Sequence, residues 1–282
     1  RGNSYLPTNL ISLICNQAMS SGFRHVVITG GEPLVHPDRD NLLKSLTDLR
    51  NNVKPLLTVL RTNLAVPMKR ELLSLVAHAT DEIVVSIDGD KKTHNQRRGV
   101  GSYEITIENL AALLDHGCSS DISLAATLST EEINGAPGYA VRELAKKFGI
   151  RRTRFKPILP IGRAAKSNIT IVPETLWGHI GSDRLIETGF SPVSTCGIGQ
   201  NLYIEPDGEI YPCYAWHNSD SSIGNITTEN GILESINSEK FCSLRYHDVN
   251  SNEQCSKCSL RYLCGGACRA WNRYEGSSKH NL

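Results

Sequence analysis

The feature that most constrains the fold is an alternation of short apolar runs with amphipathic segments, which continues to Ile158. The apolar runs, rich in β-branched residues, lie at 25–29, 56–61, 82–87, 121–128 and 151–157. The segments with a helical spacing of apolar residues lie at 7–22, 40–51, 66–78, 104–117 and 136–148. Strands that alternate with helices usually pair in parallel through right-handed crossovers. The sequence therefore predicts an α/β fold, either an open sheet or a (β/α) barrel, with its chemistry at the carboxyl ends of the strands.

The pattern changes after Ile158. One further helix is predicted at 173–189, between segments punctuated by proline and glycine. From Cys196 onward the sequence has short strand-like runs, glycine-rich turns and cysteines. We therefore predict three regions, a barrel-like region at 1–160, a linking helix region at 161–194 and a small cysteine-rich domain at 195–282.

The composition is that of a folded protein without excess charge. The chain has 282 residues, 39% of them hydrophobic and 21% charged, and its formal net charge is +1. Such a chain is long enough to bury a substantial core, and its charge gives no reason to expect nucleic acid or a membrane as partner. We find no secretory signal and no apolar run near the roughly 20 residues of a transmembrane helix. We therefore expect a cytoplasmic protein.

Cysteines concentrate in the last quarter of the chain. Nine are present, and an odd number without an export signal favours metal or redox use over a disulfide framework. The run C-x2-C-x5-C-x3-C is as dense as iron–sulfur ligand runs, whereas zinc ribbons usually separate two C-x2-C pairs by roughly 15 to 20 residues. We therefore favour an iron–sulfur site over a structural zinc site, and both over disulfides. The run consists of Cys255, Cys258, Cys264 and Cys268.

Two cysteines upstream of this run extend the pattern. Cys196 precedes, and Cys213 ends, a segment at 202–213 whose sequence predicts a β-hairpin. Thiolates are soft ligands that suit iron and zinc, so both cysteines are further candidate ligands. The three other cysteines are interpreted as small packing residues, and they are Cys15, Cys118 and Cys242.

A glycine-rich turn follows the first predicted strand. It consists of Gly30, Gly31, Glu32 and Pro33. Two glycines allow a sharp turn and a close approach of the backbone to a ligand, and the glutamate adds a carboxylate. An ordinary strand-to-helix turn would explain the same residues. Ser86 ends the third predicted strand and hence lies on the same edge of the sheet, which favours a ligand site.

Together these motifs resemble the radical S-adenosylmethionine (SAM) superfamily, in particular its members with a C-terminal SPASM domain. The segment VVITGGEPLVHPD at 26–38 is similar to the SAM-binding second strand of that family, and 86–99 is similar to its fourth strand and the loop that follows. The cysteines from Cys196 onward are similar to the SPASM pattern. The resemblance covers nearly the whole chain. It implies a partial (β/α)6 TIM-like barrel followed by a small cysteine-rich SPASM domain.

The resemblance implies a SAM site at the turn and at the neighbouring strand ends. The first three residues of the turn would hold the amino group of SAM. Asn63, in an RTN segment where the family often has TNG, would contact the ribose and carboxylate of SAM together with a serine and an arginine. The implied SAM-binding residues are Gly30, Gly31, Glu32, Pro33, Asn63, Ser86 and Arg98.

The resemblance also implies two auxiliary 4Fe-4S clusters in the SPASM domain. The first cluster would be bound by Cys196, Cys213 and Cys268. The second would be bound by Cys255, Cys258 and Cys264, together with a later cysteine. Because only three cysteines are assigned to the first cluster, one of its irons is left for a substrate group, a water or another ligand.

The chain departs from the family pattern in three ways. The C-x3-C-x2-C motif that binds the catalytic 4Fe-4S cluster is absent from the sequence, and we expect that motif and its strand to lie outside the chain as given. The final SPASM cysteine is also absent, consistent with an end truncated at Leu282. Sulfatase-maturing relatives have an aspartate directly after the second upstream cysteine, whereas this chain has Tyr214, so we do not predict that proton-accepting role.

Three aromatic residues follow Cys213 closely. Tyr214, Trp216 and His217 either line a substrate cavity beside the first auxiliary cluster or pack as aromatic core beneath the small domain. The sequence alone favours packing slightly over a cavity lining.

The resemblance implies an enzyme. A reduced 4Fe-4S cluster would cleave SAM, and the resulting 5′-deoxyadenosyl radical would abstract hydrogen from the substrate. A ribosomally made peptide is the favoured substrate, and oxidation or rearrangement of a small molecule such as a sugar or aminocyclitol is the alternative. A non-catalytic, metal-stabilised binding protein is the alternative of another class. An electron donor such as flavodoxin or ferredoxin is the implied protein partner, and no catalytic residue is assigned.

Overall fold

A computed structural model describes most of the chain, namely residues 4–52, 56–158, 196, 198–217, 219–246, 248–259, 261–266 and 269. The chain forms two compact units. The barrel unit is Pro7–Ile158, and the C-terminal unit combines Arg1–Leu6 with Leu159–Leu282. The helix predicted at 173–189 and the predicted linking region at 161–194 lie outside the described residues.

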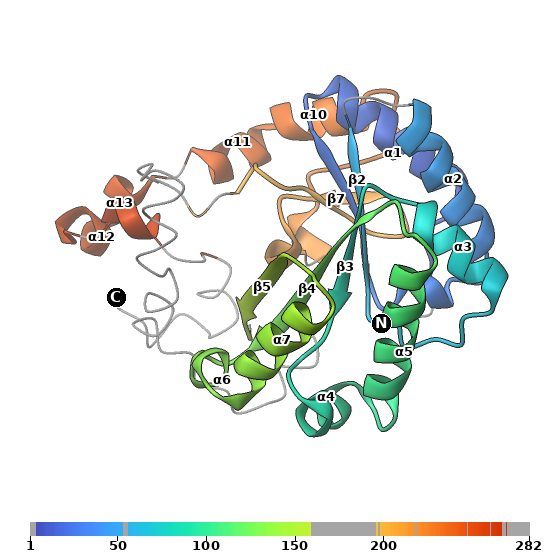
Figure 1. Cartoon of the computed structure of the whole chain (residues 1–282). Helices are drawn as coiled ribbons and strands as arrows, with labels where there is room; N and C mark the ends of the chain where they lie inside the picture. Colours follow the sequence, from blue (N-terminus) through green and yellow to red (C-terminus); the bar gives the residue numbers. More distant parts are fainter. Residues whose placement is uncertain are drawn as a thin grey trace. The chain divides into compact units, whose positions relative to one another are not determined.

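A parallel sheet of five strands forms the centre of the barrel unit (Figure 1). The strands follow one another in chain order, and each neighbouring pair is parallel. Their bounds agree with the predicted runs to within one or two residues, so the α/β prediction is confirmed. The strands are β1 (His25–Ile28), β2 (Leu57–Thr62), β3 (Glu82–Ser86), β4 (Asp121–Leu128) and β5 (Arg152–Pro157).

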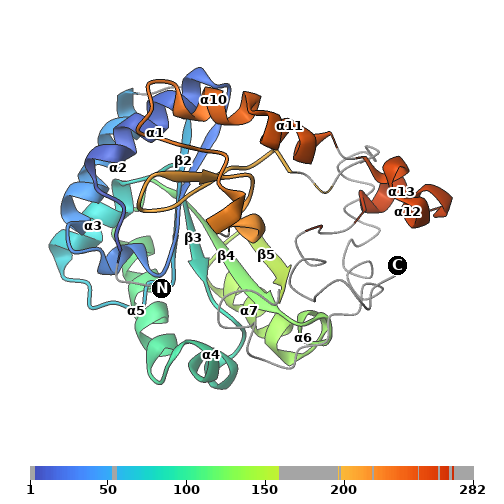
Figure 2. The ribbon, with the colours of Figure 1, turned by 180° about the vertical axis from the view of Figure 1, so that it is seen from behind.

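Helices cover one face of this sheet. Figures 1 and 2 show the strands with the helices on one side of them, as in a partial barrel. Gly22, with φ of 86°, follows the first helix and donates its N–H to the carbonyl of Met19, which is typical of a glycine that ends a helix. No helix in the described part of the chain is long and apolar enough to cross a membrane. The five predicted helices are α1 (Asn9–Ser20), α2 (Arg39–Asn52), α3 (Arg70–His78), α5 (Ser102–Asp115) and α7 (Ala136–Lys147).

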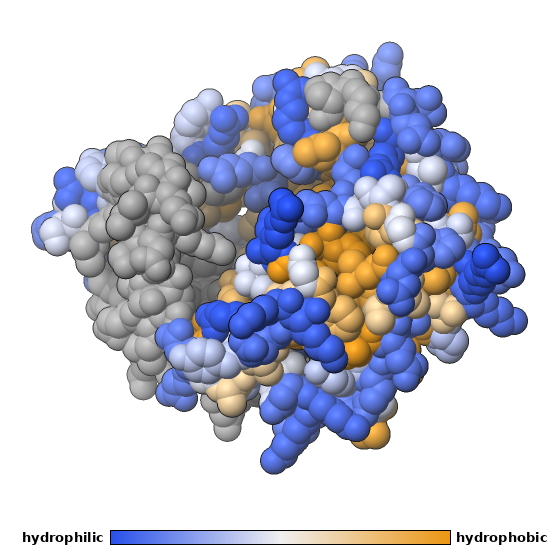
Figure 3. Space-filling model, in the orientation of Figure 1, coloured by the Kyte–Doolittle hydropathy of each residue, from blue (hydrophilic) through white to orange (hydrophobic). Residues whose placement is uncertain are grey.

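The two faces of the strands differ in polarity. Strand residues that point toward the helices, such as Leu60, Ile83 and Leu124, are fully buried. Because side chains alternate along a strand, their neighbours point to the opposite face, which we call the inner face. In Figure 3 hydrophobic side chains gather beside α5 and are surrounded by hydrophilic ones. The helix-covered face therefore supplies most of the hydrophobic core, and the inner face carries charged side chains such as Glu82 beside buried apolar ones such as Val84.

Two short helices of the barrel unit occupy segments that we did not predict to be helical. They are α4 (Lys91–Arg98), in a segment expected as a loop, and α6 (Thr130–Asn134). Only His94 is buried in α4, so the helix has no apolar periodicity to detect. Its start is fixed by Asp90, whose carboxylate accepts from the N–H of Thr93 at 2.8 Å. Local capping, rather than an apolar stripe, therefore specifies this helix.

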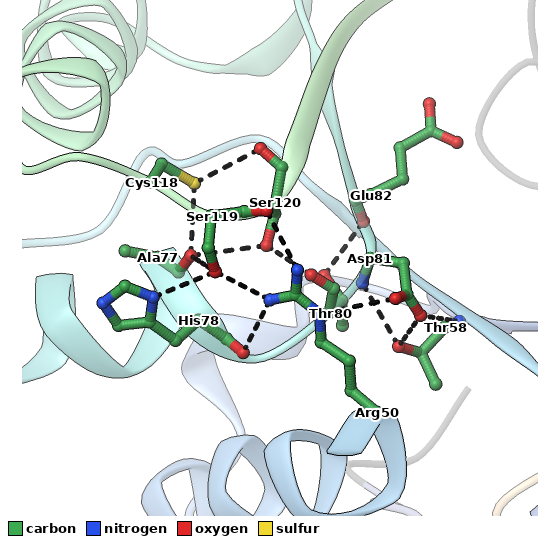
Figure 4. A network of polar contacts seen from close by, with 10 residues as sticks. All are labelled: Arg50, Thr58, Ala77, His78, Thr80, Asp81, Glu82, Cys118, Ser119 and Ser120. Atoms are coloured by element: carbon green, nitrogen blue, oxygen red, sulfur yellow. Dashed lines mark hydrogen bonds and ion pairs between the residues drawn. The ribbon is translucent and has the colours of Figure 1, made fainter. Parts of the chain in front are cut away.

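A polar network connects the amino ends of neighbouring strands (Figure 4). Arg50 of α2 donates to the hydroxyl and carbonyl oxygens of Ser119 at 2.7 and 2.9 Å, and to the carbonyl of His78 at 3.2 Å. The carboxylate of Asp81 accepts from the backbone N–H and the hydroxyl of Thr58 at 2.8 and 3.0 Å. These bonds tie one helix to the loops that precede β3 and β4. The stabilising network lies at the edge of the sheet opposite to the predicted site.

The described part of the C-terminal unit has short strands and short helices. Its three-stranded antiparallel sheet contains β6 (Tyr203–Ile204), β7 (Glu209–Tyr211) and β8 (Gly224–Asn225). The first two strands form the predicted hairpin. Its turn requires Gly208, because φ is 88° and a Cβ there would lie 2.9 Å from an Asn225 side-chain atom. The helices among its described residues are α10 (Gly231–Asn237), α11 (Glu239–Arg245), α12 (Glu253–Lys257) and α13 (Arg261–Cys264), and the short 3-10 helices there are η3 (Tyr214–Trp216), η4 (Ser219–Ser221) and η5 (Val249–Ser251).

Candidate functional site

The glycine-rich turn after β1 presents accessible backbone. Gly30 and Gly31 are exposed, and a Cβ at either position would have no atom within 4 Å. The φ angle of Gly30 is 143°, a conformation that favours glycine. Pro33 and Leu34 are buried in the short helix η1 (Pro33–Val35) and anchor the end of the turn. The open space beside the two glycines fits a ligand that binds backbone groups.

Glu32 joins the carboxyl ends of β1 and β2. Its Oε1 accepts from the hydroxyl of Thr62 at 2.6 Å and from the N–H of Leu34 at 3.0 Å, and its Oε2 accepts from the N–H of Asn63 at 2.7 Å. A carboxylate has about four acceptor positions, so three hydrogen bonds leave room for about one more. The carboxylate is thus held rigidly and keeps capacity for one ligand donor.

The segment after β2 is held in an unusual backbone conformation. Leu64 has φ of 55° and is the one non-glycine residue with positive φ in the described part of the chain. It is fully buried, its N–H donates to the Thr62 hydroxyl at 2.9 Å, and its carbonyl accepts from Asn109 at 2.7 Å. The side-chain oxygen of Asn63 accepts from the N–H of Ala65 at 2.7 Å. This leaves the Asn63 amide NH2 without a partner among the described residues, so it can donate to a ligand.

Asp88 organises the end of β3. Its carboxylate accepts from the N–H of Thr127 at 2.9 Å and from Nε of Arg98 at 2.7 Å. Its own N–H donates to Nδ1 of His94 at 3.2 Å. Arg98 is therefore oriented by Asp88, and the ends of β3 and β4 are joined. Ser86, the half-buried last residue of β3, has no hydrogen-bond partner for its hydroxyl within the described ranges.

His94 is held neutral at the centre of this arrangement. It is fully buried, and burial lowers its pKa to about 4, with the positive charge of Arg98 as the next contribution. Because Nδ1 accepts a hydrogen bond, the proton of the neutral ring lies on Nε2, which is buried and has no partner in the described part of the chain. The ring of Tyr103 meets it edge-on, with centroids 5.7 Å apart. His94 thus serves as a packing and acceptor group.

The structure brings the predicted SAM-binding residues to one edge of the sheet. Glu32 links its own turn to Asn63, and the arginine is fixed beside β3 through Asp88. Their contacts with a ligand remain predictions. We predicted no role for Thr62 and Asp88, although both lie within motifs that we quoted. Polar residues at strand ends were the available signal.

The predicted cluster ligands are only partly described. Cys196, Cys213 and Cys255 are half-buried, and Cys258 is exposed. The N–H of Cys258 donates to the carbonyl of Cys255 at 3.0 Å, so C-x2-C forms a tight turn at the end of α12. Cys268 and the side chain of Cys264 lie outside the described residues. Within the described ranges no three metal-ligating side chains gather into a site, so both ligand sets remain predictions.

The aromatic residues after Cys213 pack together. The rings of Tyr214 and His217 stack with centroids 5.2 Å apart, and Tyr203 meets both edge-on. Arg269 lies over the ring of Trp216 at 5.5 Å. These contacts show that the rings of Tyr214 and His217 pack against each other, although Tyr214 itself is exposed. A role in lining a cavity is not supported by the described contacts.

Two protein-family models match the sequence in the regions that the motifs indicate. The radical SAM superfamily model matches residues 5–135, and the SPASM model, described as an iron–sulfur cluster-binding domain, matches residues 196–259. These regions contain the glycine-rich turn and the cysteine-rich segment, respectively.

Curated relatives share low identity over most of the chain. An uncharacterised protein of Archaeoglobus fulgidus is 24% identical over 89% of the chain and 63% of its own length. The serine-type anaerobic sulfatase-maturating enzyme of Klebsiella aerogenes is 21% identical over 70% of the chain and 54% of its own length. The PqqA peptide cyclase of Methylorubrum extorquens is 22% identical over 95% of the chain and 73% of its own length. The chain thus spans less than two thirds of the first two relatives.

Solved structures share the fold. SuiB of Streptococcus suis, bound to S-adenosylmethionine, is 19% identical with a TM-score of 0.75 and covers 99% of this chain and 69% of its own. Native anSMEcpe with bound AdoMet is 17% identical with a TM-score of 0.71 and covers 99% of this chain and 84% of its own. The partial barrel, the glycine-rich turn, the cysteine run and both family models agree, and the chain therefore belongs to the radical SAM superfamily, with a C-terminal SPASM domain.

Proposed function

We infer that this chain is part of a radical SAM enzyme that modifies a ribosomally made peptide. The observation that carries the inference is the carboxyl edge of the sheet, where accessible glycine backbone, a fixed carboxylate and unpartnered amide and hydroxyl donors lie on adjacent strands. This donor set suits a ligand with an ammonium, a ribose and a carboxylate, as SAM has. A peptide substrate is supported by relatives that act on peptides or were solved with one, including PqqA peptide cyclase and SuiB bound to the precursor peptide SuiA.

Each residue of this edge binds or orients one group of SAM. The backbone of Gly30 and Gly31 and the remaining acceptor position of Glu32 bind the ammonium of SAM. The amide of Asn63 and the hydroxyl of Ser86 bind its ribose and carboxylate. Arg98 approaches the carboxylate in an orientation fixed by Asp88. The rigid hydrogen bonds around Glu32 orient the cofactor before the reaction, which limits the loss of entropy on binding.

The chemistry itself comes from the bound groups. A bound 4Fe-4S cluster and SAM would together supply the one-electron chemistry needed to abstract hydrogen from the substrate, and the residues of this edge would bind and orient SAM for it. The cysteines of the SPASM domain hold the auxiliary clusters in this proposal, with Cys196, Cys213 and Cys268 for one and Cys255, Cys258 and Cys264 for the other. An electron donor such as flavodoxin or ferredoxin supplies the reducing electron.

The proposal is tested with the full-length protein, reconstituted anaerobically with iron and sulfide and reduced with dithionite. We expect it to convert SAM to 5′-deoxyadenosine and methionine. Mass spectrometry of the reaction mixture should show that a short peptide encoded beside the gene loses hydrogen and changes mass in the presence of SAM. Ser86→Ala should reduce the rate of 5′-deoxyadenosine formation, whereas Ser45→Ala, on the outer helix α2, should leave it unchanged. No 5′-deoxyadenosine from the reconstituted wild type would reject the enzyme, and product from a small molecule but from no peptide would reject the substrate class.

A further inference from the structure

The inner face of the sheet carries an unusual concentration of charge. Glu82 of β3 accepts from Nη2 of Arg154 of β5 at 2.7 and 3.0 Å, and from the hydroxyl of Ser123 of β4 at 2.7 Å. These bonds cross β4, so the three side chains lie on one face. Arg61 lies on the same face, because Val59, two residues before it in β2, pairs with Glu82. Lys156 shares the face with Arg154, two residues before it in β5.

The cations on this face outnumber the carboxylates. Arg154 pairs with Glu82, and Arg152 pairs with Asp121. Two cations remain, Arg61 and Lys156. Neither makes a hydrogen bond or an ion pair with any described residue, and Nε of Arg61 is buried without a hydrogen-bond partner.

These two cations are not ordinary surface charges. Arg61 is half-buried, and burial lowers its pKa, as does the positive charge of Arg154, whereas the carboxylate of Glu82 raises it. Lys156 keeps an exposed surface, but the protein around it lowers its pKa by desolvation, and Arg61 and Arg154 lower it further. Two like charges that repel each other near the interior destabilise the fold unless an anion balances them.

We propose that Arg61 and Lys156 bind a carboxylate of the substrate on the inner face of the sheet. A carboxylate between them would accept charge-assisted hydrogen bonds from the guanidinium and the ammonium and would balance both charges. SAM does not serve this purpose well, because its sulfonium and ammonium together outweigh its single carboxylate. The proposal rests on the proposed function, since it names the substrate group that this enzyme would recognise, namely an acidic side chain or a free C-terminus of a peptide.

The test uses the reactivity of Lys156 in the full-length protein. Trace acetylation with acetic anhydride, followed by peptide mass spectrometry, measures Lys156 and the exposed Lys146 of α7 in the same sample. The probes are N-acetylglutamate amide, which carries a side-chain carboxylate, its neutral match N-acetylglutamine amide, and N-acetylalanine, which carries a terminal carboxylate. We expect saturable protection of Lys156 by one or both acids and none by the neutral probe. Lys146 should react equally in every sample.

Arg61→Gln should weaken the protection of Lys156 about tenfold, because it removes one of the two cations. Circular dichroism would show that this variant is folded. The proposal is overturned if the neutral probe protects Lys156 as well as the acids do, if no probe protects it, or if the folded Arg61→Gln protein is protected as well as wild type. It is also overturned if SAM alone gives the full protection, because the cations would then serve the cofactor.

A separate measurement distinguishes this site from the proposed function. Formation of 5′-deoxyadenosine from SAM without substrate does not require the carboxylate site, so Lys156→Gln should retain it. If wild type forms no 5′-deoxyadenosine and Lys156 is still protected by an acid, the proposed function fails and the carboxylate site stands as a binding site. If 5′-deoxyadenosine forms and Lys156 is never protected, the proposed function stands and the carboxylate site fails.

Discussion

At the scale of single residues, Glu32 has two tasks. Its carboxylate accepts three hydrogen bonds that hold the turn after β1 against the start of the segment after β2, and it keeps one acceptor position for a ligand. A glutamine would present an NH2 group to one of these donors. The same substitution therefore tests the ligand contact and the local scaffold together.

We expect Glu32→Gln to weaken SAM binding to the full-length protein by roughly ten- to a hundredfold. The ammonium of SAM loses a charge-assisted hydrogen bond worth about 1.5 to 3 kcal/mol. Isothermal titration calorimetry measures the affinity. The matched control is Glu71→Gln, which changes an exposed glutamate of α3 and should bind SAM as wild type does. Equal affinities for both variants would mean that Glu32 serves only the turn.

The side chains that come together at the glycine-rich turn could be predicted from the sequence, whereas those that come together on the inner face could not. The turn is a contiguous tetrapeptide, so its glycines and glutamate can be read together. Arg61, Arg154 and Lys156 are separated by up to 95 positions, and each stands in a run that the apolar pattern marks simply as a strand. Only the strand register shows that they share a face. The positive φ of Leu64 could not be predicted from the sequence either, because it depends on hydrogen bonds with Thr62 and with Asn109 of α5.

At the scale of elements, α4 shows what packing adds to a polar sequence. Its single buried residue, His94, accepts a hydrogen bond from the end of β3, and its last residue, Arg98, pairs with Asp88. The helix is thus fixed to the sheet by polar contacts instead of an apolar stripe. The five longer helices were predictable because each has several buried apolar residues at helical spacing.

The buried histidine makes the stability of the barrel unit depend on pH. The pKa of His94 is about 4 in the folded protein and about 6.5 in an unfolded chain, so only the unfolded state takes up the proton between these values. Stability should therefore fall as pH decreases through this window, by up to about 1.4 kcal/mol for each pH unit. The negative charges of Asp88 and Glu104 raise the pKa of His94, and the positive charge of Arg98 lowers it.

Urea unfolding between pH 4 and 7 measures this effect. Because glutamine does not titrate in this range, we expect His94→Gln to show a smaller loss of stability than wild type as the pH falls. The comparison variant His25→Gln changes an exposed histidine of β1 and should keep the pH dependence of wild type. Parallel curves for wild type and His94→Gln would show that the ring is protonated in the folded protein or is not buried in solution.

At the scale of the whole molecule, the chain combines a unit of regularly alternating strands and helices with a unit whose described elements are short. The barrel unit could be predicted closely, because apolar runs and amphipathic segments determine its order. The C-terminal unit was predictable in its hairpin and its cysteine run, whereas α10 and α11 were not anticipated, since each has only seven residues. In a unit with such short elements, bound metal is expected to supply stability that a small core does not.

If metal stabilises this unit, the iron and sulfide content of the protein should depend on its predicted cysteine ligands. The full-length protein, reconstituted anaerobically, should contain iron and acid-labile sulfide, and Cys255→Ser should lower both because it removes a predicted ligand of an auxiliary cluster. Cys242→Ser is the matched control, since Cys242 lies in α11 and its thiol contacts the carbonyl of Ile236 at 3.9 Å. It should retain the wild-type iron and sulfide. Stoichiometric zinc without labile sulfide would replace the iron–sulfur assignment with a structural zinc site. Equal metal loss from both variants would show that folding, rather than ligation, was disturbed.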